Sequence, residues 1–446
     1  MARLFGTDGI RGKTNQDPIT PEKALEIGRS IVTCCHRKGL CPRIILGRDT
    51  RESGKMLEYG FLAGALSQGG EVYRVGEIPT PAVAYFTRAE GGGAGMVISA
   101  SHNPYEDNGF KFFGSAGYKF SRAEEEEMEA LISSTHNRSE GPDSGRAKRV
   151  EDAAERYAGF LAELLPAGNR FKGIGLVIDC ANGATYKVAP LLFDRVGSGF
   201  EILFGEPDGK NINHNCGSQH PGPLRARVLE SGASAGFAFD GDGDRLVAVD
   251  ERGTVLTGDQ LLAIFAKMLK DTGALKENRV VCTVMSNMGL RRALEQEGIE
   301  QVITGVGDRN VMETMVARKA NLGGEGSGHI IFHDVHTTGD GLLSALQLLK
   351  AMVHFQRPLS ELASWVTLFP QVIRNVPVRG KPELSTVPEI AGAVQAVESK
   401  LGERGRVLVR YSGTEPVCRI MVEGEDAADV ETYAEEIAET VRRELS

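Results

Sequence analysis

Three aspartates alternate with glycine in the segment DGDGDR, at Asp240, Asp242 and Asp244. Alternate side chains of an extended or tightly turned backbone project to one side, so this spacing brings three carboxylates together. Crowded carboxylates repel one another unless a cation offsets their charge, and oxygen ligands of this kind suit Mg²⁺. The neighbouring Arg245 offsets only part of that charge. The segment therefore predicts a divalent-metal site with the three aspartates as ligands.

A calcium-binding EF-hand loop and a polar hairpin turn are two other interpretations of this segment. The three aspartates and Glu251 stand at EF-hand positions 1, 3, 5 and 12. The position that requires glycine holds Arg245, however, and the flanking residues alternate as in strands instead of forming helices. A polar turn explains aspartate and glycine, but it does not require three aspartates in register.

Ser101 follows the apolar run MVISA and precedes an Asn103-Pro104 turn. A serine at the end of a strand is held at the mouth of a sheet, where its hydroxyl can act as a nucleophile with help from a base or a charge field. The alternative is a turn serine that hydrogen-bonds its own backbone. Because neighbours on a strand point to opposite faces, we expect no direct pair with His102. Lys111 could supply positive charge or a proton, or be a solvated surface lysine.

The N-terminal segment GTDGIRGKT, residues 6–14, is similar to a phosphate-binding P-loop but departs from it in two ways. Five residues instead of four separate Gly6 from Gly12, and only five residues precede the segment, too few for the strand that a P-loop follows. Nucleotide hydrolysis is therefore a poor expectation, although Arg11 in a glycine loop can still meet an anion.

Glu325 and Ser327 lie among four glycines in the segment GGEGSGHI. A carboxylate and a hydroxyl on a thin loop suit a ligand dense in hydroxyl groups, such as a sugar. A flexible turn without a ligand is the alternative.

The segment RYSGTEPVCR places Arg410, Ser412, Thr414 and Arg419 around Gly413. Two guanidiniums, two hydroxyls and exposed backbone N–H groups are the groups that hold a phosphate dianion. The segment therefore predicts a phosphate site.

Three segments of one plan are expected to position these loops, at residues 44–78, 175–208 and 280–307. Each runs as strand, polar turn, helix, glycine stop and strand. The repetition predicts three βαβ cores, whose loop-bearing edges are where ligands usually bind. Because the segments lie more than 100 residues apart, they indicate domain repeats and not solenoid units.

We expect an α/β protein of four domains, at residues 1–150, 151–253, 254–370 and 371–446. A stretch rich in charge, Ser, Gly and Pro marks the boundary after the first core. Beyond residue 370 the pattern changes to strands and a final amphipathic helix, which predicts a smaller α+β domain after three similar mixed α/β domains. The apolar residues on one face of that helix are Val430, Tyr433, Ala434, Ile437, Val441 and Leu445.

Composition excludes several classes of protein. The 446 residues are two to four times the usual domain size. The net charge of −9 is the reverse of the basic excess that nucleic-acid and membrane-surface binders carry. Seven scattered cysteines without a CxxC pair argue for reduced thiols. We find no signal peptide and no run of 18 apolar residues, so we expect a cytoplasmic location.

Taken together, the five segments resemble the α-D-phosphohexomutase family. ASHNP, DGDGDR, GEGSGH and RYSGTEP occur in family order, one in each expected domain, and the similarity runs from GTDGIRG to RIMVEGED. PDGKNINHNCGSQHP and TTGDGLLSALQLL are similar to the branch of the family that acts on aminosugar phosphates. The resemblance implies an isomerase, an intramolecular phosphotransferase with four domains around a central cleft.

The resemblance also implies a role for each candidate residue. Ser101 would carry a covalent phosphate, and one oxygen of that phosphoserine would join the three aspartates in holding Mg²⁺. Arg11 and Lys111 match cationic residues near the serine, where proton transfer is expected. The residues that would bind the phosphosugar are His102, Arg245, Glu325, Ser327, Arg410, Ser412, Gly413, Thr414 and Arg419.

The implied reaction converts glucosamine 6-phosphate into glucosamine 1-phosphate, a precursor of UDP-N-acetylglucosamine for cell-wall synthesis, with a sugar 1,6-bisphosphate as intermediate and activator. Gly326 departs from the aminosugar branch, which usually has glutamine there, so phosphomannomutase or phosphoglucomutase activity is the nearest alternative. A non-catalytic sugar-phosphate or Ca²⁺-binding protein is the alternative from another class. The expected partner is a small phosphosugar, not nucleic acid or membrane, and a homodimer is left open.

Overall fold

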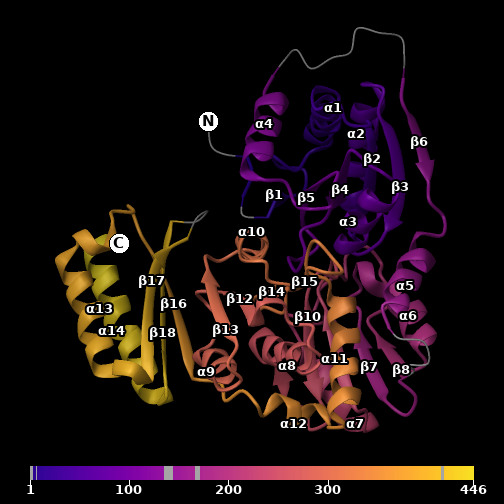
Figure 1. The fold of residues 1–446 in the computed structure, drawn as a ribbon. Coiled ribbons are helices and arrows are strands. Elements are labelled where there is room, and N and C mark those ends of the chain that lie inside the picture. The colour runs from indigo at the N-terminus through magenta and orange to yellow at the C-terminus, as the bar shows by residue number, and fades with distance from the viewer. Residues whose placement is uncertain (1–3, 7, 135–143, 166–170, 413–415) are drawn as a thin grey trace. The chain divides into compact units, whose positions relative to one another are not determined.

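The computed structural model describes residues 4–6, 8–134, 144–165, 171–412 and 416–446. They form two compact units (Figure 1). The first unit comprises residues 1–284 and 299–365, and the second comprises residues 285–298 and 366–446.

The first sheet has six strands in the order β1-β5-β4-β2-β3-β6. Its parallel core is β4-β2-β3, with β6 parallel to β3, while β5 runs antiparallel to both β4 and β1. The strands are β1 (Ile10–Lys13), β2 (Arg43–Arg48), β3 (Glu71–Glu77), β4 (Ala94–Ile98), β5 (Asp107–Gly114) and β6 (Arg146–Arg149). The helices of this segment are α1 (Pro21–Arg37), α2 (Ser53–Leu66), α3 (Thr80–Ala89) and α4 (Arg122–Ile132).

The second sheet has five strands in the order β11-β10-β9-β7-β8. Its parallel core is β9-β7-β8, and β10 returns antiparallel to β9. The strands are β7 (Gly175–Asp179), β8 (Gly199–Leu203), β9 (Ala235–Phe239), β10 (Leu246–Asp250) and β11 (Val255–Leu256). The helices are α5 (Ala153–Glu163), α6 (Val188–Val196) and α7 (Gly222–Ser231), with a 3₁₀ turn at Ala184–Tyr186.

The third sheet has four strands in the order β13-β12-β14-β15. Its parallel core is β14-β12-β13, and β15 returns antiparallel to β14. The strands are β12 (Arg279–Thr283), β13 (Glu300–Thr304), β14 (Leu322–Gly324) and β15 (Ile330–Phe332). The helices are α8 (Gly258–Asp271), α10 (Asp308–Arg318), α11 (Gly341–Phe355) and α12 (Leu359–Ala363), with a 3₁₀ turn at Lys276–Asn278.

These three sheets share one plan, a parallel three-stranded core extended by an antiparallel hairpin strand. The plan confirms the predicted repetition of βαβ cores in mixed α/β domains. In each sheet the hairpin begins at the carboxyl end of a parallel core strand, which is the edge where open α/β sheets bind ligands. The segments with candidate residues after β4, β9 and β14 all lie in these hairpins.

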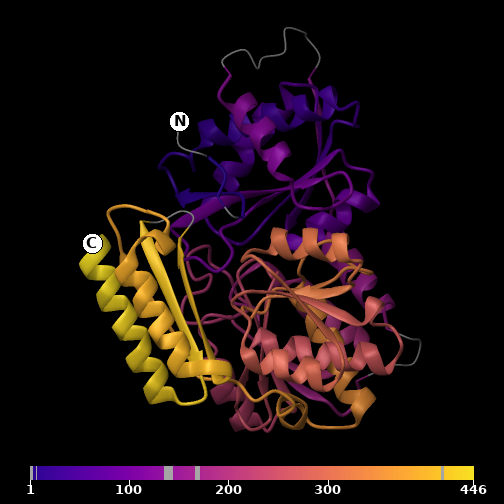
Figure 2. The same cartoon turned by 60° about the vertical axis from the view of Figure 1, so that its left-hand side comes forward.

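The second unit contains a three-stranded antiparallel sheet in the order β16-β18-β17, with α13 and α14 on one face (Figure 2). Its elements are α9 (Met288–Gln296), β16 (Gln371–Pro377), α13 (Pro388–Leu401), β17 (Gly405–Tyr411), β18 (Val417–Gly424) and α14 (Ala427–Leu445), with 3₁₀ turns at Leu384–Thr386 and Gly402–Arg404. On α14, the predicted apolar face is buried at Val430, Ala434, Ile437 and Val441, and Tyr433 and Leu445 are partly buried against it. This confirms the smaller α+β fold of the C-terminal segment.

β11 pairs with β10 although it lies beyond residue 253, so the second sheet extends past one predicted boundary. The boundaries at residues 150, 253 and 370 remain predictions. All seven cysteines lie among the described residues and carry free thiols, six of them buried and Cys41 exposed. Among the described residues, we find no helix with the length and hydropathy needed to cross a bilayer.

Candidate active site

Ser101 lies three residues beyond the end of β4, in a turn and not on the strand. Its backbone φ of 54° falls in the left-handed region, which residues other than glycine seldom adopt. The residue is 1% exposed, and its Oγ donates a hydrogen bond to Asp240 Oδ2 at 2.6 Å. The fold therefore holds this hydroxyl against an aspartate 139 positions away in the chain.

The three aspartates lie in the loop that joins β9 to β10, between strands as the flanking alternation predicts. All three are buried, and one oxygen of each lies within 4.8 Å of the others. Among the described residues, Asp242 Oδ1 and Asp244 Oδ1 have no hydrogen-bond partner although they are buried. A divalent cation would satisfy such oxygens, so the residues present fit Mg²⁺.

Glycine is required within the aspartate loop because the serine turn packs directly against it. A Cβ on Gly241 would lie 2.5 Å from the carbonyl oxygen of Ser101. Gly243 has a φ of 71°, and a Cβ there would lie 2.6 Å from the Thr185 side chain. The alternating glycines therefore permit both the turn and the close approach of the serine.

Burial and neighbouring charges act differently on two of these carboxyl groups. Desolvation, together with the charges of Asp244 and Asp242, holds the pKa of Asp240 well above its usual value. Burial acts in the same direction on Asp244, but Lys111 and His329 outweigh it and hold the pKa of Asp244 well below its usual value. A buried carboxyl group that resists ionisation beside two others gains most from an added cation.

Lys111 and Arg11 form the cationic side of the site. Lys111 is 2% exposed, and its Nζ lies 2.7 Å from Asp242 Oδ2 and 3.1 Å from Oδ2 of both Asp244 and Asp8. Burial alone would lower the pKa of Lys111, but these carboxylates hold it well above its usual value. Arg11 forms an ion pair with Asp8, so both cations stay charged beside the aspartates.

The prediction of no direct pair between Ser101 and His102 is wrong. His102 Nδ1 lies 3.2 Å from Ser101 Oγ. Opposite orientation holds for neighbours in an extended strand, whereas the left-handed backbone of Ser101 turns the two side chains toward each other. Burial, followed by the charges of Arg245 and Arg11, lowers the pKa of His102 to about 4. Its imidazole is therefore neutral near pH 7 and can accept a hydrogen bond.

Glu325 and Ser327 lie in the hairpin between β14 and β15, and this loop packs against the first turn of α8. The backbone N–H of Gly258 donates to the carbonyl oxygen of Gly326 at 3.0 Å. A Cβ on Gly326 would lie 3.1 Å from Asp259 Oδ2. A larger side chain at position 326 would therefore require the Asp259 carboxylate to shift.

Arg245 interacts with both the aspartates and the Glu325 loop. Its Nε lies 3.9 Å from Asp240 Oδ2 and 3.8 Å from Asp244 Oδ1. Burial lowers the pKa of Arg245, but the charges of the aspartates and of Glu325 raise it above its usual value. Glu325 Oε1 accepts a hydrogen bond from the backbone N–H of Gly307 at 3.0 Å.

Four further charged residues join this group without having been predicted. His329 Nδ1 lies 3.6 Å from Asp244 Oδ1, and its Nε2 lies 3.6 Å from Asp308 Oδ2. Lys119 forms ion pairs with Asp308 and, at 2.5 Å, with Asp8 Oδ1. His329 lies in the segment GEGSGH and Asp8 in GTDGIRG, so the sequence motifs could have identified these two residues. Lys119 and Asp308 stand in no recognisable motif.

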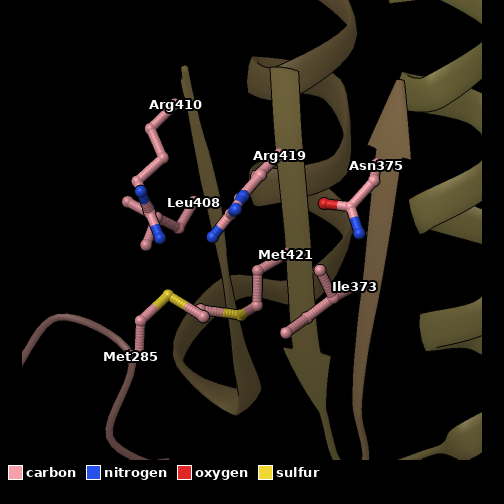
Figure 3. A pocket seen from close by; sticks show the side chains of 7 residues that line it. All are labelled: Met285, Ile373, Asn375, Leu408, Arg410, Arg419 and Met421. Carbon is pink, nitrogen blue, oxygen red and sulfur yellow. The ribbon is translucent and has the colours of Figure 1, made fainter. Parts of the chain in front are cut away.

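The second unit holds the predicted phosphate residues. Arg410 and Arg419 are cross-strand partners on β17 and β18, and both line a pocket of about 270 Å³ on the sheet (Figure 3). The lining residues are Met285, Ile373, Asn375, Leu408, Arg410, Arg419 and Met421. Burial and the charge of Arg419 lower the pKa of Arg410, so an anion bound beside both guanidiniums would be stabilised. Ser412 follows β17, while Gly413 and Thr414 lie outside the described residues.

Four family models match the chain in order. They describe phosphoglucomutase/phosphomannomutase alpha/beta/alpha domain I at residues 2–139, domain II at 155–253, domain III at 257–369 and the C-terminal domain at 374–440. Together they cover most of the sequence.

Relatives of nearly the same length are similar over the whole chain. The chain is 50% identical to the phosphoglucosamine mutase of Syntrophus aciditrophicus over 448 residues, which covers 100% of both chains. It is 48% identical to that of Geobacillus kaustophilus, covering 100% of this chain and 99% of the relative.

Solved structures share the fold at lower identity. A phosphoglucomutase/phosphomannomutase family protein from Burkholderia thailandensis has a TM-score of 0.82 at 23% identity, with 99% of this chain and 97% of that chain covered. The Aspergillus fumigatus N-acetylphosphoglucosamine mutase in complex with GlcNAc-6P and magnesium has a TM-score of 0.70 at 16% identity, with 99% and 96% covered.

Proposed function

The chain belongs to the phosphoglucomutase/phosphomannomutase family, and from this premise we propose that it interconverts glucosamine 6-phosphate and glucosamine 1-phosphate. Relatives named phosphoglucosamine mutase, at 46 to 50% identity over the full length, support the choice of sugar. The product would feed the synthesis of UDP-N-acetylglucosamine.

The observation that carries the proposed chemistry is the contact between Ser101 Oγ and Asp240 Oδ2 at 2.6 Å. It places a hydroxyl at the edge of a buried group of three carboxylates. Two oxygens of this group, Asp242 Oδ1 and Asp244 Oδ1, accept no hydrogen bond among the described residues. Lys111 lies on another side of that cluster. A serine so placed suits the carrier of a phosphoryl group, whose negative charge requires cations nearby.

Ser101 takes part in both transfers as the phosphoryl carrier. In the first, the bond between phosphorus and Ser101 Oγ breaks while a bond forms to the 1-hydroxyl oxygen of glucosamine 6-phosphate, and the proton of that hydroxyl ends on Ser101 Oγ. The glucosamine 1,6-bisphosphate then turns over in the site. In the second, the bond between phosphorus and O6 breaks while a bond forms to Ser101 Oγ, and the proton of the Ser101 hydroxyl ends on O6. The products are glucosamine 1-phosphate and restored phosphoserine.

Nearby side chains supply charge and hydrogen bonds for these steps. Lys111 and Arg11 offset the charge of the transferring group, and neutral His102, 3.2 Å from Ser101 Oγ, can accept a hydrogen bond there. Asp240, Asp242 and Asp244, with one oxygen of phosphorylated Ser101, would hold Mg²⁺, which supplies charge neutralisation when bound.

The remaining candidates are proposed to bind the substrate. Glu325 and Ser327 would contact the sugar hydroxyls, because they lie on a loop whose histidine, His329, reaches Asp244. Arg245 would bind a phosphate oxygen near the aspartates. The proposed phosphate-binding residues of the second unit are Arg410, Ser412, Gly413, Thr414 and Arg419.

Mass spectrometry of the purified protein, followed by a mutase assay, tests the proposal. We expect a phosphate on Ser101 in part of the molecules and loss of activity in Ser101→Ala even with added sugar 1,6-bisphosphate. The exposed Ser115 offers a matched Ser115→Ala control, which should keep its activity. Full activity of Ser101→Ala would exclude this serine as the phosphoryl carrier and return a non-catalytic binding protein to consideration.

Comparison of kcat/KM on glucosamine, glucose and mannose phosphates tests the sugar. The nearest alternative, phosphoglucomutase or phosphomannomutase activity, follows from Gly326. If glucose or mannose phosphate is preferred by about tenfold, equivalent to about 1.4 kcal/mol, the aminosugar assignment fails. Light scattering tests whether the chain forms a homodimer, which remains a prediction.

A further inference from the structure

One buried guanidinium holds the loop that carries Ser101. Arg51 is 0% exposed, and its Nη2 donates to the carbonyl oxygens of Ser101 at 3.0 Å and Asn103 at 2.8 Å. Its Nη1 donates to the carbonyl oxygens of Asp107, at 3.0 Å, and of Pro104. Four of the five N–H donors of this side chain therefore bind carbonyl oxygens of one short segment, residues 101–107.

The fifth donor of Arg51, its Nε, is linked to the backbone N–H of Ser101 through a chain of hydrogen bonds. The Nε donates to Asp49 Oδ2 at 2.9 Å. The same carboxylate oxygen accepts a hydrogen bond from Ser99 Oγ at 2.6 Å, and Ser99 Oγ in turn accepts one from the Ser101 backbone N–H at 2.9 Å. Arg51, Asp49 and Ser99 thus hydrogen-bond, directly or through one another, to both the backbone N–H and the carbonyl oxygen of Ser101.

Asn213 reaches the serine loop from the segment that follows β8. Its Nδ2 donates to the carbonyl oxygens of Ser101 and Asn103, at 2.9 Å each, which are two of the oxygens that Arg51 contacts. Asn213 is 8% exposed and lies in the segment PDGKNINHNCGSQHP after β8. That segment carries a sequence signal but supplies none of the candidate site residues.

These contacts matter because Ser101 is held in an unfavourable backbone conformation. A φ of 54° costs free energy for a residue with a side chain. Such a conformation persists only where contacts with the surrounding residues stabilise it. In this conformation, Ser101 Oγ meets Asp240. A Cβ on Gly241 would lie 2.5 Å from the Ser101 carbonyl oxygen and 2.8 Å from Asn213 Nδ2, so the aspartate loop packs closely against both residues.

We propose that Arg51 and Asn213 are positioning residues, which jointly clamp the Ser101 and Asn103 carbonyl oxygens and keep Ser101 Oγ at the aspartate cluster. The inference rests on the proposed function, since it explains how the phosphoryl-carrying serine is oriented. Arg51 acts from the segment that follows β2 of the first sheet. Asn213 acts from the segment that follows β8 of the second sheet, which also carries the aspartates, and it couples the serine turn to them.

Asn213→Ala and Asn215→Ala form a matched pair of variants. Both asparagines have a positive φ, 57° and 53°, so alanine has the same backbone cost at each position. Asn215 is exposed, and among the described residues its side chain hydrogen-bonds the neighbouring His214, 3.4 Å away, and not the serine loop. We expect Asn213→Ala to lower kcat by about tenfold with KM within about twofold, while Asn215→Ala changes neither beyond about twofold.

Arg51→Lys and Arg43→Lys form the second pair. Lysine keeps the charge but carries its donors on one nitrogen, so it cannot replace a fork that serves four carbonyl oxygens and a carboxylate. Arg43 is the first residue of β2, the strand that ends three residues before Arg51, and its Nε donates to Glu71. We expect Arg51→Lys, but not Arg43→Lys, to lower kcat. If Arg51→Lys does not fold, Asn213→Ala still tests the proposal.

Hydrogen exchange of the amides of residues 99–110 gives a readout independent of activity. We expect faster exchange in Asn213→Ala than in Asn215→Ala and the wild type. If the wild type has no mutase activity but Asn213→Ala still exchanges faster than Asn215→Ala, the proposed function is wrong and the clamp is supported. Unchanged exchange and kcat in Asn213→Ala, or equal losses in both asparagine variants, would overturn the clamp.

Discussion

Lys111→Met removes the central cation of the site while keeping a side chain of similar length. Lys111 is 2% exposed and contacts Asp242, Asp244 and Asp8 within 3.1 Å. Removing one partner of a buried ion pair leaves uncompensated charge and typically costs about 3–5 kcal/mol. At roughly 2–4 °C for each kcal/mol in a large domain, we expect a melting transition lower by about 6–20 °C.

Lys38→Met is the matched control, because Lys38 is also a lysine with several carboxylate partners, two in its case, but at the surface. Its Nζ lies 3.2 Å from Glu124 and 3.3 Å from Glu127, and its side chain is 33% exposed. Exposed ion pairs contribute about 0–1 kcal/mol, so its transition should fall by less than about 4 °C. Scanning calorimetry in EDTA measures both variants.

Addition of Mg²⁺ extends the same experiment. A bound cation would offset the carboxylates that Lys111 leaves behind, so the deficit of Lys111→Met relative to the wild type should be smaller in Mg²⁺ than in EDTA. The deficit of Lys38→Met relative to the wild type should be the same in both, because Mg²⁺ stabilises these two proteins equally. Equal transitions for the two variants in EDTA would refute the assignment of Lys111 as the main cation of the cluster. No recovery with Mg²⁺ would contradict the metal site.

Three further outcomes are expected. Removal of metal with EDTA should abolish mutase activity and Mg²⁺ should restore it; activity that survives exhaustive chelation would contradict the role of the aspartates. Gly241→Ala should lower kcat by more than about tenfold, since its Cβ would lie 2.5 Å from the Ser101 carbonyl oxygen. Burial, followed by Arg88, lowers the pKa of His336 to about 3, so the unfolded chain binds a proton near pH 6.5 that the folded chain does not. Acidification from about pH 6.5 to 5 should therefore reduce the unfolding free energy less in His336→Gln than in the wild type, as measured by urea unfolding, and parallel slopes would exclude this histidine.

The aspartate loop shows how far a local pattern can be followed. Because Asp240, Asp242 and Asp244 stand within five consecutive residues between two strands, any turn that the glycines permit keeps their carboxylates close. The βαβ repeats were predictable for the same reason, since apolar periodicity and glycine stops act over neighbouring residues. Long-range partners such as Lys119 and Asp308 left no such pattern.

His102 marks where local reasoning failed. Its relation to Ser101 was inferred from strand alternation, but contacts from Arg51 and Asn213 stabilise a left-handed turn at the serine and reverse the geometry. Arg51 stands 50 residues from Ser101 and Asn213 stands 112 residues away, so no spacing between them could be recognised.

The sequence by itself determined which elements form and which loops carry hydroxyls, carboxylates and guanidiniums, because these properties depend on contiguous residues. Tertiary structure alone decided that Ser101 meets Asp240, that Lys111 lies among three carboxylates and that Asn213 reaches the serine turn. Those contacts join different sheets and hairpins, and their distances follow from how the cores pack, with no trace in the spacing of residues along the chain.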